Sequence, residues 1–357
     1  MREAREGVYS GQKVRVEAAA RAGRPVYFRL IPPWTAPPMP PGTVSGRAQL
    51  LTSAFTTSTT LLGWGSLIVL AVLVRRNLRL GRADRTGARR LAVGATIAQT
   101  LSAVLMAHTP LGGAVDGLPQ GLFFGLLAWL FCLGFEPAMR RTWPRLLIAS
   151  TRLLDGRWRD PLVGRAVLPG VLVGLAVALP WSLGLTRLRD LPGGGPTDVP
   201  FVLPVGGLAA FVADQVFFLA WTLQVTLLVV AVLLVVRLLA RRTDVTVLIV
   251  VALFVGWNYM MLLGSRPATI SASLLLVPTM LYSLLFVWVF WRHGALAFFA
   301  SWFVENLAAY APWTLDMSRW YAWRQWCVVA IITALAVWGF RNVLGKQSAF
   351  PAAALDA

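Results

Sequence analysis

The sequence predicts an all-α polytopic membrane protein with about nine transmembrane helices and a short N-terminal β-hairpin tail. Three observations support this. The chain is 57% hydrophobic, with a mean hydropathy of +0.66; runs such as Val225–Val236 carry no charge; and arginines alternate in density from one connection to the next. About 20 apolar residues cross a bilayer core as a helix, and helices satisfy their own backbone polar groups in lipid.

Residues 1–49 differ in character from the rest of the chain. On both sides of an Ala22-Gly23 turn, apolar residues alternate with polar ones, at Val14, Val16 and Ala18 and again at Val26, Phe28 and Leu30. This pattern predicts a β-hairpin. A lone hairpin is marginally stable, so we expect it to be the end of a larger sheet. The prolines between 32 and 41 predict a stiff, extended linker.

The predicted transmembrane domain covers residues 50–345 and precedes a C-terminal tail, residues 346–357. Its spans lie at about 54–74, 91–107, 119–138, 163–185, 206–238, 245–264, 269–291, 294–310 and 322–340. The fifth is too long for one crossing, and Pro204 with Gly206-Gly207 predicts a short entry helix before the true span. The eighth is short, and whether it crosses fully is left open.

The basic residues predict the orientation of the spans. Alternate connections hold twenty Lys and Arg against five in the others. The positive-inside rule places the richer set in the cytoplasm, with the N-terminus outside and the C-terminus inside a bacterial cytoplasmic (inner) membrane. The eight Lys and Arg of the N-terminal tail oppose this orientation. Since most arginines flank apolar runs, anionic lipid headgroups account for the net charge of +18 better than nucleic acid does.

The inventory of reactive side chains predicts no catalytic, cofactor-binding or metal-binding residues. Cys132 and Cys327 lie in apolar segments, and His108 and His293 lie at predicted helix ends without an HExxH context. The sequence therefore predicts a protein that is not an enzyme.

Polar residues inside predicted spans are the strongest candidates for a functional site. Asp214 with Gln215 and Glu305 with Asn306 form two such pairs. An unpaired carboxylate at the bilayer centre costs about 3 kcal/mol or more, so each should face the bundle or a wet cavity. Asp214 has three candidate partners, which are Arg266, Arg319 and Arg324. Structural pairing and a transport or sensing site both remain open.

The connection from Met139 to Arg165 predicts a basic, amphipathic segment. Pro144 can start a short helix, leucines alternate with arginines, and such a segment suits the cytoplasmic headgroup layer. We expect Asp160 to cap the helix that starts at Pro161. The basic residues of this connector are Arg140, Arg141, Arg145, Arg152, Arg157, Arg159 and Arg165.

Several stretches together resemble a known family. They are VRVEAAARAGRPVYFRLIPPWT, RRNLRLGRADRTGARRLA, EPAMRRTWPRLLIASTRLLDGRWRDPLVGR, PWTLDMSRWYA and GFRNVLG. This series resembles the C-terminal membrane region of large bacterial serine/threonine protein kinases. The resemblance implies that an extracytoplasmic β-rich segment precedes a polytopic membrane block. The chain carries no Gly-rich phosphate loop, VAIK-like lysine, HRD or DFG motif, so no catalytic residue transfers.

The resemblance favours a non-catalytic membrane module with a sensory, anchoring or signalling role. Its expected partners are a kinase domain, docked on the basic connector, or a second copy of the chain. The orphan hairpin favours a truncated kinase over a fragment or a stand-alone relative. A small-molecule transporter or permease is the alternative, and a membrane enzyme using Asp214 or Glu305 is third.

Overall fold

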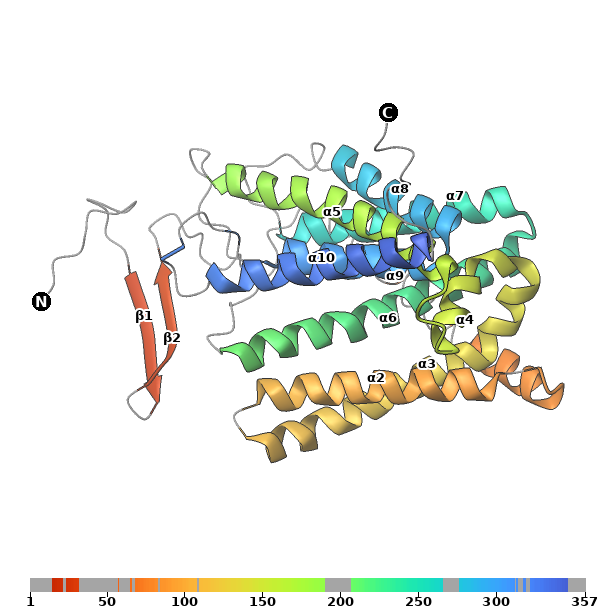
Figure 1. Ribbon diagram of the computed structural model, residues 1–357, viewed down its shortest axis with the longest axis horizontal. Helices are drawn as coiled ribbons and strands as arrows, with labels where there is room; N and C mark the ends of the chain where they lie inside the picture. The colour runs from red at the N-terminus through yellow and green to blue at the C-terminus, as the bar shows by residue number, and fades with distance from the viewer. Residues whose placement is uncertain are drawn as a thin grey trace, which may run out of the picture.

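The computed structural model describes a helical bundle and a two-stranded hairpin (Figure 1). The residues that it describes are 15–21, 24–31, 57, 65, 68–82, 84–107, 109–189, 207–265, 276–311, 313, 317–318 and 322–345. The expected proline-rich linker, the C-terminal tail, most of the first expected span, His108, Arg266 and Arg319 lie outside them.

Strands β1 (Arg15–Arg21) and β2 (Arg24–Ile31) pair antiparallel. Val16 is opposite Leu30, Ala18 is opposite Phe28, and the register shifts between Ala19 and Ala20. Residues 68–79 are helical. The other helices are α2 (Arg85–Met106), α3 (Pro110–Thr142), η1 (Pro144–Leu146), α4 (Ile148–Leu154), α5 (Pro161–Arg189), α6 (Leu208–Ala240), α7 (Thr243–Ser265), α8 (Leu276–His293), α9 (Ala295–Ala309) and α10 (Ala322–Leu344).

Five helices in the described part of the chain are long and apolar enough to cross a membrane, which makes this a helical membrane protein. They are α3, α6 and α10 over their full lengths, α5 over Pro161–Leu179 and α7 over Thr243–Met260. Helix α9 has 15 residues and spans about 22 Å, which is less than the roughly 30 Å of a bilayer core.

Two helix boundaries correct the expectations from sequence. Helix α6 runs unbroken for 33 residues, so the predicted entry helix is wrong. No Pro or Gly follows Leu208 within it, and the backbone has no reason to break. Helix α3 begins at Pro110 rather than near Pro119, because Thr109 accepts a hydrogen bond from the Gly112 N–H at 3.3 Å and caps it.

Small residues allow the helix backbones to approach closely, as is typical of membrane bundles. Helix α3 faces α2 with Gly113, Gly117, Gly121 and Gly125. A Cβ atom at Gly113 would lie 2.6 Å from the Cα of Val104. Helix α5 approaches α9 in the same way, because a Cβ at Gly170 would lie 2.6 Å from the Ala297 carbonyl oxygen. These contacts bind α2 to α3 and α5 to α9.

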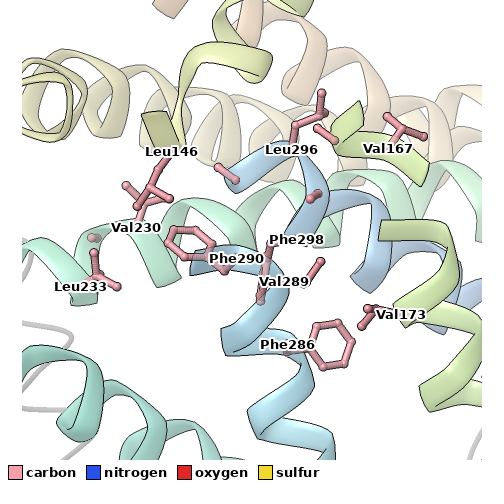
Figure 2. Packing of buried hydrophobic residues seen from close by; sticks show 14 of the residues in the cluster. Leu146, Val167, Val173, Val230, Leu233, Phe286, Val289, Phe290, Leu296 and Phe298 are labelled. Carbon is pink, nitrogen blue, oxygen red and sulfur yellow. The ribbon is translucent and has the colours of Figure 1, made fainter. Parts of the chain in front are cut away.

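Aromatic side chains from α8 and α9 fill the centre of the bundle (Figure 2). The rings of Phe286 and Phe290 in α8 each lie 5.7 Å from that of Phe298 in α9, edge to face. Val173 of α5 and Val230 of α6 belong to the same buried cluster. Since lipid is as apolar as these residues, close packing rather than escape from water holds the helices together.

Candidate functional site

Asp214 and Gln215 lie half-buried in the second turn of α6. The Gln215 side-chain amide donates to the Phe211 carbonyl at 3.2 Å, while its Oε1 is buried with no hydrogen-bond partner among the described residues. The Ser102 hydroxyl of α2 donates to the Ala213 carbonyl at 3.1 Å. The predicted polar pair therefore lies where α2 packs on the start of α6.

Arg324 is the cation that lies near Asp214. It sits in the first turn of α10, is only 3% exposed, and interacts electrostatically with the Asp214 carboxylate. Its guanidinium carbon lies 5.6 Å from the ring centre of Trp323, and Trp323 packs edge to face on Phe211 at 5.4 Å. Of the three candidate partners of Asp214, only Arg324 lies among the described residues, and the structure places it near Asp214.

Glu305 and Asn306 lie in the last two turns of α9. Asn306 is buried, and its amide donates to the Trp302 carbonyl at 2.7 Å. Glu305 interacts electrostatically with Tyr282 of α8 and with Tyr310 at the end of α9. Tyr310 stacks on Phe218 of α6 at 5.2 Å. This aromatic pair links the helices of the two predicted polar sites.

The connector between α3 and α5 folds against the opposite end of the bundle. Leu146 is buried, and a Cβ at Gly294 would lie 2.6 Å from the Leu146 carbonyl oxygen. Gly294 also has a φ of 91°, a conformation that L side chains rarely adopt. Trp143 packs edge to face on Trp291 of α8 at 5.4 Å. The start of the connector is thus fixed to the junction of α8 and α9.

Asp160 closes the connector and begins α5. Its Oδ1 accepts a hydrogen bond from the Leu162 N–H at 2.9 Å, and its Oδ2 pairs with Arg152 of α4. The Leu162 N–H, then Arg152, holds the pKa of this carboxyl below its ordinary value. The predicted helix cap at Asp160 is confirmed.

Two further hydrogen bonds attach the connector to the bundle. The Arg90 guanidinium of α2 donates to the Leu154 carbonyl at 3.0 Å. The Asn342 amide of α10 donates to the Trp158 carbonyl at 2.7 Å. At the start of the connector, Arg140 pairs with Glu136 one helical turn away, at 2.6 Å. The connector is therefore held at four places: on the α8–α9 junction, on α2, on α10 and at the start of α5.

The described arginines of the basic connections lie at the same end of the bundle as the connector. The contacts of α4 with α2, α5 and α9 place the first two connections and the start of α9 there. Val229 and Leu233 of α6, Val247 of α7 and Trp291 of α8 line one narrow crevice, which places the α6–α7 turn at this end. Figure 1 shows the end of α10 beside α4.

We call this surface the arginine face. Its exposed arginines are Arg75, Arg76, Arg79, Arg82, Arg85, Arg89, Arg90, Arg140, Arg141, Arg145, Arg157, Arg159, Arg165, Arg241, Arg242, Arg292 and Arg341. The described acidic residues at this end are Asp84, Glu136, Asp155, Asp160 and Asp244. The face is strongly positive. Six of the seven predicted connector arginines belong to it, and the seventh, Arg152, is half-buried in its pair with Asp160.

Sequence reasoning missed two asparagines that fix this end. The Asn77 amide donates to the carbonyls of Leu133 and Gly134 in α3, both at 2.9 Å, and Asn342 holds the connector. Both are buried and both follow an arginine at a helix end. An Asn at this position can be recognised in the sequence as a candidate helix tie, because a buried amide needs hydrogen-bond partners. The glycines at every fourth position from 113 to 125 likewise indicate a close helix–helix contact.

Within the described residues, no cluster of His, Cys, Asp and Glu could hold a metal ion. Comparison of the chain with family models, curated proteins and solved structures gives no match.

Proposed function

We propose that this chain is a non-catalytic module of a bacterial cytoplasmic membrane with an anchoring, sensory or signalling role. The observation that carries the proposal is the arginine face, a positive surface built on fixed backbone. Three contacts restrain its connector between α3 and α5: Arg152 with Asp160, Asn342 with the Trp158 carbonyl, and Arg90 with the Leu154 carbonyl. A restrained charged surface suits binding, because less side-chain and backbone freedom is lost on contact.

We further propose nine spans, with the N-terminus outside and the arginine face in the cytoplasm. The gathering of arginines at one end supports this orientation through the positive-inside rule. The hairpin tail, residues 1–49, is then extracytoplasmic, and residues 346–357 are cytoplasmic. Helix α9 is the weakest of the nine, since its 15 residues need a thinner or locally deformed bilayer.

The partner that we propose for the arginine face is a cytoplasmic protein domain. The resemblance to membrane regions of bacterial serine/threonine kinases suggests a kinase domain, and a second copy of this chain is the other candidate. The chain itself carries no kinase motif, so we expect the purified protein to transfer no phosphoryl group from ATP to itself or to a generic substrate.

Site-specific photo-crosslinking in living cells tests this proposal. A crosslinking amino acid replaces exposed Arg145 on the arginine face or, as the control, exposed Leu111 at the other end of the bundle. We expect a kinase-domain protein or a second copy of the chain to be captured at 145 and not at 111. Equal capture at both positions, or protein adducts at 111 alone, would contradict the proposal.

A transporter is the second candidate, and the Asp214–Arg324 interaction favours it. Charged pairs inside membrane bundles recur along substrate and ion pathways. The Oε1 atom of Gln215, next to Asp214 in the chain, is a further buried acceptor that has no hydrogen-bond partner among the described residues. Uptake of a labelled solute into proteoliposomes that is lost in Asp214→Asn, with folding intact, would establish transport. Uptake that is the same in both proteins would remove Asp214 from any transport path.

A further inference from the structure

The segment from Gly156 to Asp160 forms a shallow hollow on the arginine face. Its lining is Gly156, Arg157, Trp158, Arg159 and Asp160. Arg157 and Arg159 are exposed, and Trp158 is 63% exposed. This short stretch places an exposed indole next in sequence to two exposed arginines. It combines the two residue types that favour the membrane interface.

The hollow lies at the level of the lipid headgroups. Asp160 directly precedes Pro161, where a candidate membrane span begins, and Asn342, which holds the Trp158 carbonyl, is in the last turn of another. The headgroup layers occupy only about 5–8 Å on each side of the hydrocarbon core. A loop attached to the ends of two spans therefore lies within or next to that layer.

The charge of the hollow favours an anion. Asp160 is the acidic residue in its lining, and this carboxylate is already engaged by Arg152 and by the Leu162 N–H. Arg157 is also near Asp160 electrostatically, and Asp155 is exposed next to the hollow. Arg159 adds a further positive charge. Guanidinium groups bind phosphate oxygens with two parallel hydrogen bonds.

The backbone of the hollow is held before any ligand arrives. Asn342 holds the Trp158 carbonyl at 2.7 Å, and the Asp160 N–H donates to the Arg157 carbonyl at 3.1 Å. Gly156 takes a φ of 81°, which turns the chain out of α4. This arrangement fixes the backbone that carries Arg157, Trp158 and Arg159 and reduces the entropy lost on binding.

We infer that this hollow is a binding site for the phosphate of an anionic phospholipid in the cytoplasmic leaflet. Arg157 and Arg159 bind the phosphate oxygens, and Trp158 inserts its ring between the glycerol backbones of neighbouring lipids. The inference rests on the proposed orientation, because it requires the arginine face to lie at the cytoplasmic leaflet.

The test is a lipid titration of the purified full chain in detergent, followed by native mass spectrometry. Phosphatidylglycerol is compared with phosphatidylcholine for the wild type and for Arg157→Gln/Arg159→Gln. Because Arg157 and Arg159 would each lose their charge-assisted hydrogen bonds to the lipid phosphate, losing both should weaken the preference for phosphatidylglycerol at least about 30-fold. The matched control is Arg75→Gln/Arg76→Gln, which removes the same charge from exposed positions of the same face, and it should change the preference by no more than about threefold.

Equal losses in the two double variants would overturn the site, since they would show that only the total charge matters. Asn342→Ala separates a shaped site from surface charge in a second way, because it removes no charge and frees the Trp158 carbonyl. It should weaken phosphatidylglycerol binding, and unchanged binding would count against the held hollow.

Inorganic phosphate added as competitor should displace little lipid; full displacement would indicate a site for soluble phosphate. If the titration shows no preference for phosphatidylglycerol while labelling in cells confirms the proposed orientation, the lipid site is refuted and the proposed function is not.

Discussion

Asp160 shows how one residue joins a loop to a membrane helix. Its carboxylate accepts the Leu162 N–H and pairs with Arg152. The first of these stabilises the start of α5, and the second holds α4 against it. The sequence predicts the cap, because Asp before Pro is a common helix start, but it does not predict Arg152 as the partner, since several arginines lie at similar distances along the chain.

We expect Asp160→Ala to lower the free energy of unfolding of the detergent-solubilised protein by about 0.5–2 kcal/mol, the usual effect of losing an N-cap. Asp160→Asn keeps the cap and should lose less. The pKa of Asp160 is lowered by folding, so its charge stabilises the fold above the ordinary pKa of an aspartate, and this contribution disappears as the pH falls through the lowered value. Thermal unfolding as a function of pH measures both effects.

If Asp160→Asn were as stable as the wild type at neutral pH, the pair with Arg152 would contribute nothing. The difference in stability between the wild type and Asp160→Asn should shrink on acidification, as Asp160 becomes protonated. A difference that grows as the pH falls would contradict the direction of the pKa shift.

Two of the predicted polar residues inside the bundle, Asp214 and Asn306, have partners that a structural role explains. Asp214 interacts with Arg324, and Asn306 bonds to its own helix. We therefore expect Asp214→Asn to fold normally, because an amide still forms hydrogen bonds there, whereas Asp214→Leu should lose about 1–3 kcal/mol by leaving buried groups unpaired. Glu305→Gln should also fold normally, and Glu305→Leu should lose stability only if it leaves buried groups unpaired. Detergent thermal stability, compared with any cellular readout, tests this.

The outcome that would sink the structural interpretation is an Asp214→Asn protein that inserts and folds normally and has lost its cellular activity. That pattern would mark Asp214 as a ligand or proton site.

At the scale of elements, the contact between α2 and α3 depends on glycine. A Cβ at Gly121 would lie 2.8 Å from the Thr96 carbonyl oxygen, a backbone atom that cannot move aside alone. Gly94 of α2 has nothing within 4 Å of an added Cβ. The two glycines are therefore a matched pair, one packed between helices and one facing outward.

Gly121→Ala should destabilise the protein by about 1–3 kcal/mol, as overpacked sites do. Gly94→Ala should be neutral or stabilise it by about 0.5–1 kcal/mol, because Ala favours a helix more than Gly does. Thermal unfolding in one detergent ranks the two variants against the wild type. A Gly121→Ala protein as stable as Gly94→Ala would show that α2 and α3 are not packed as described.

The sequence located the helices better than it located their ends and neighbours. Hydropathy identifies the apolar parts of α5, α7 and α10, because lipid requires them. Hydropathy does not predict that α3 continues through polar residues to Thr142. Hydrogen bonds and packing, rather than contact with lipid, stabilise those last turns. From the sequence, the partner of Asp214 could be narrowed only to three arginines, because the contact between the starts of α6 and α10 depends on the tertiary fold.

At the scale of the whole molecule, the fold gathers the exposed arginines of the described residues at one end. The arginine face covers the end where α4 lies. The starts of α6 and α10, which carry Asp214 and Arg324, lie towards the other end (Figure 1). The alternating density of arginine along the chain therefore has a counterpart in space. The proposed orientation, the partner and the lipid site all depend on which side of the membrane the arginine face occupies.

The most direct test is cysteine labelling of intact cells with a membrane-impermeant thiol reagent, in a background where Cys132 and Cys327 are replaced by Ser. Single cysteines at Thr86 and Asp155, exposed on the arginine face, should stay unlabelled until the membrane is permeabilised. Cysteines at Pro110 and Met317, exposed at the other end, should label from outside. Labelling of Thr86→Cys and Asp155→Cys in intact cells, with Pro110→Cys and Met317→Cys protected, would contradict the proposed orientation.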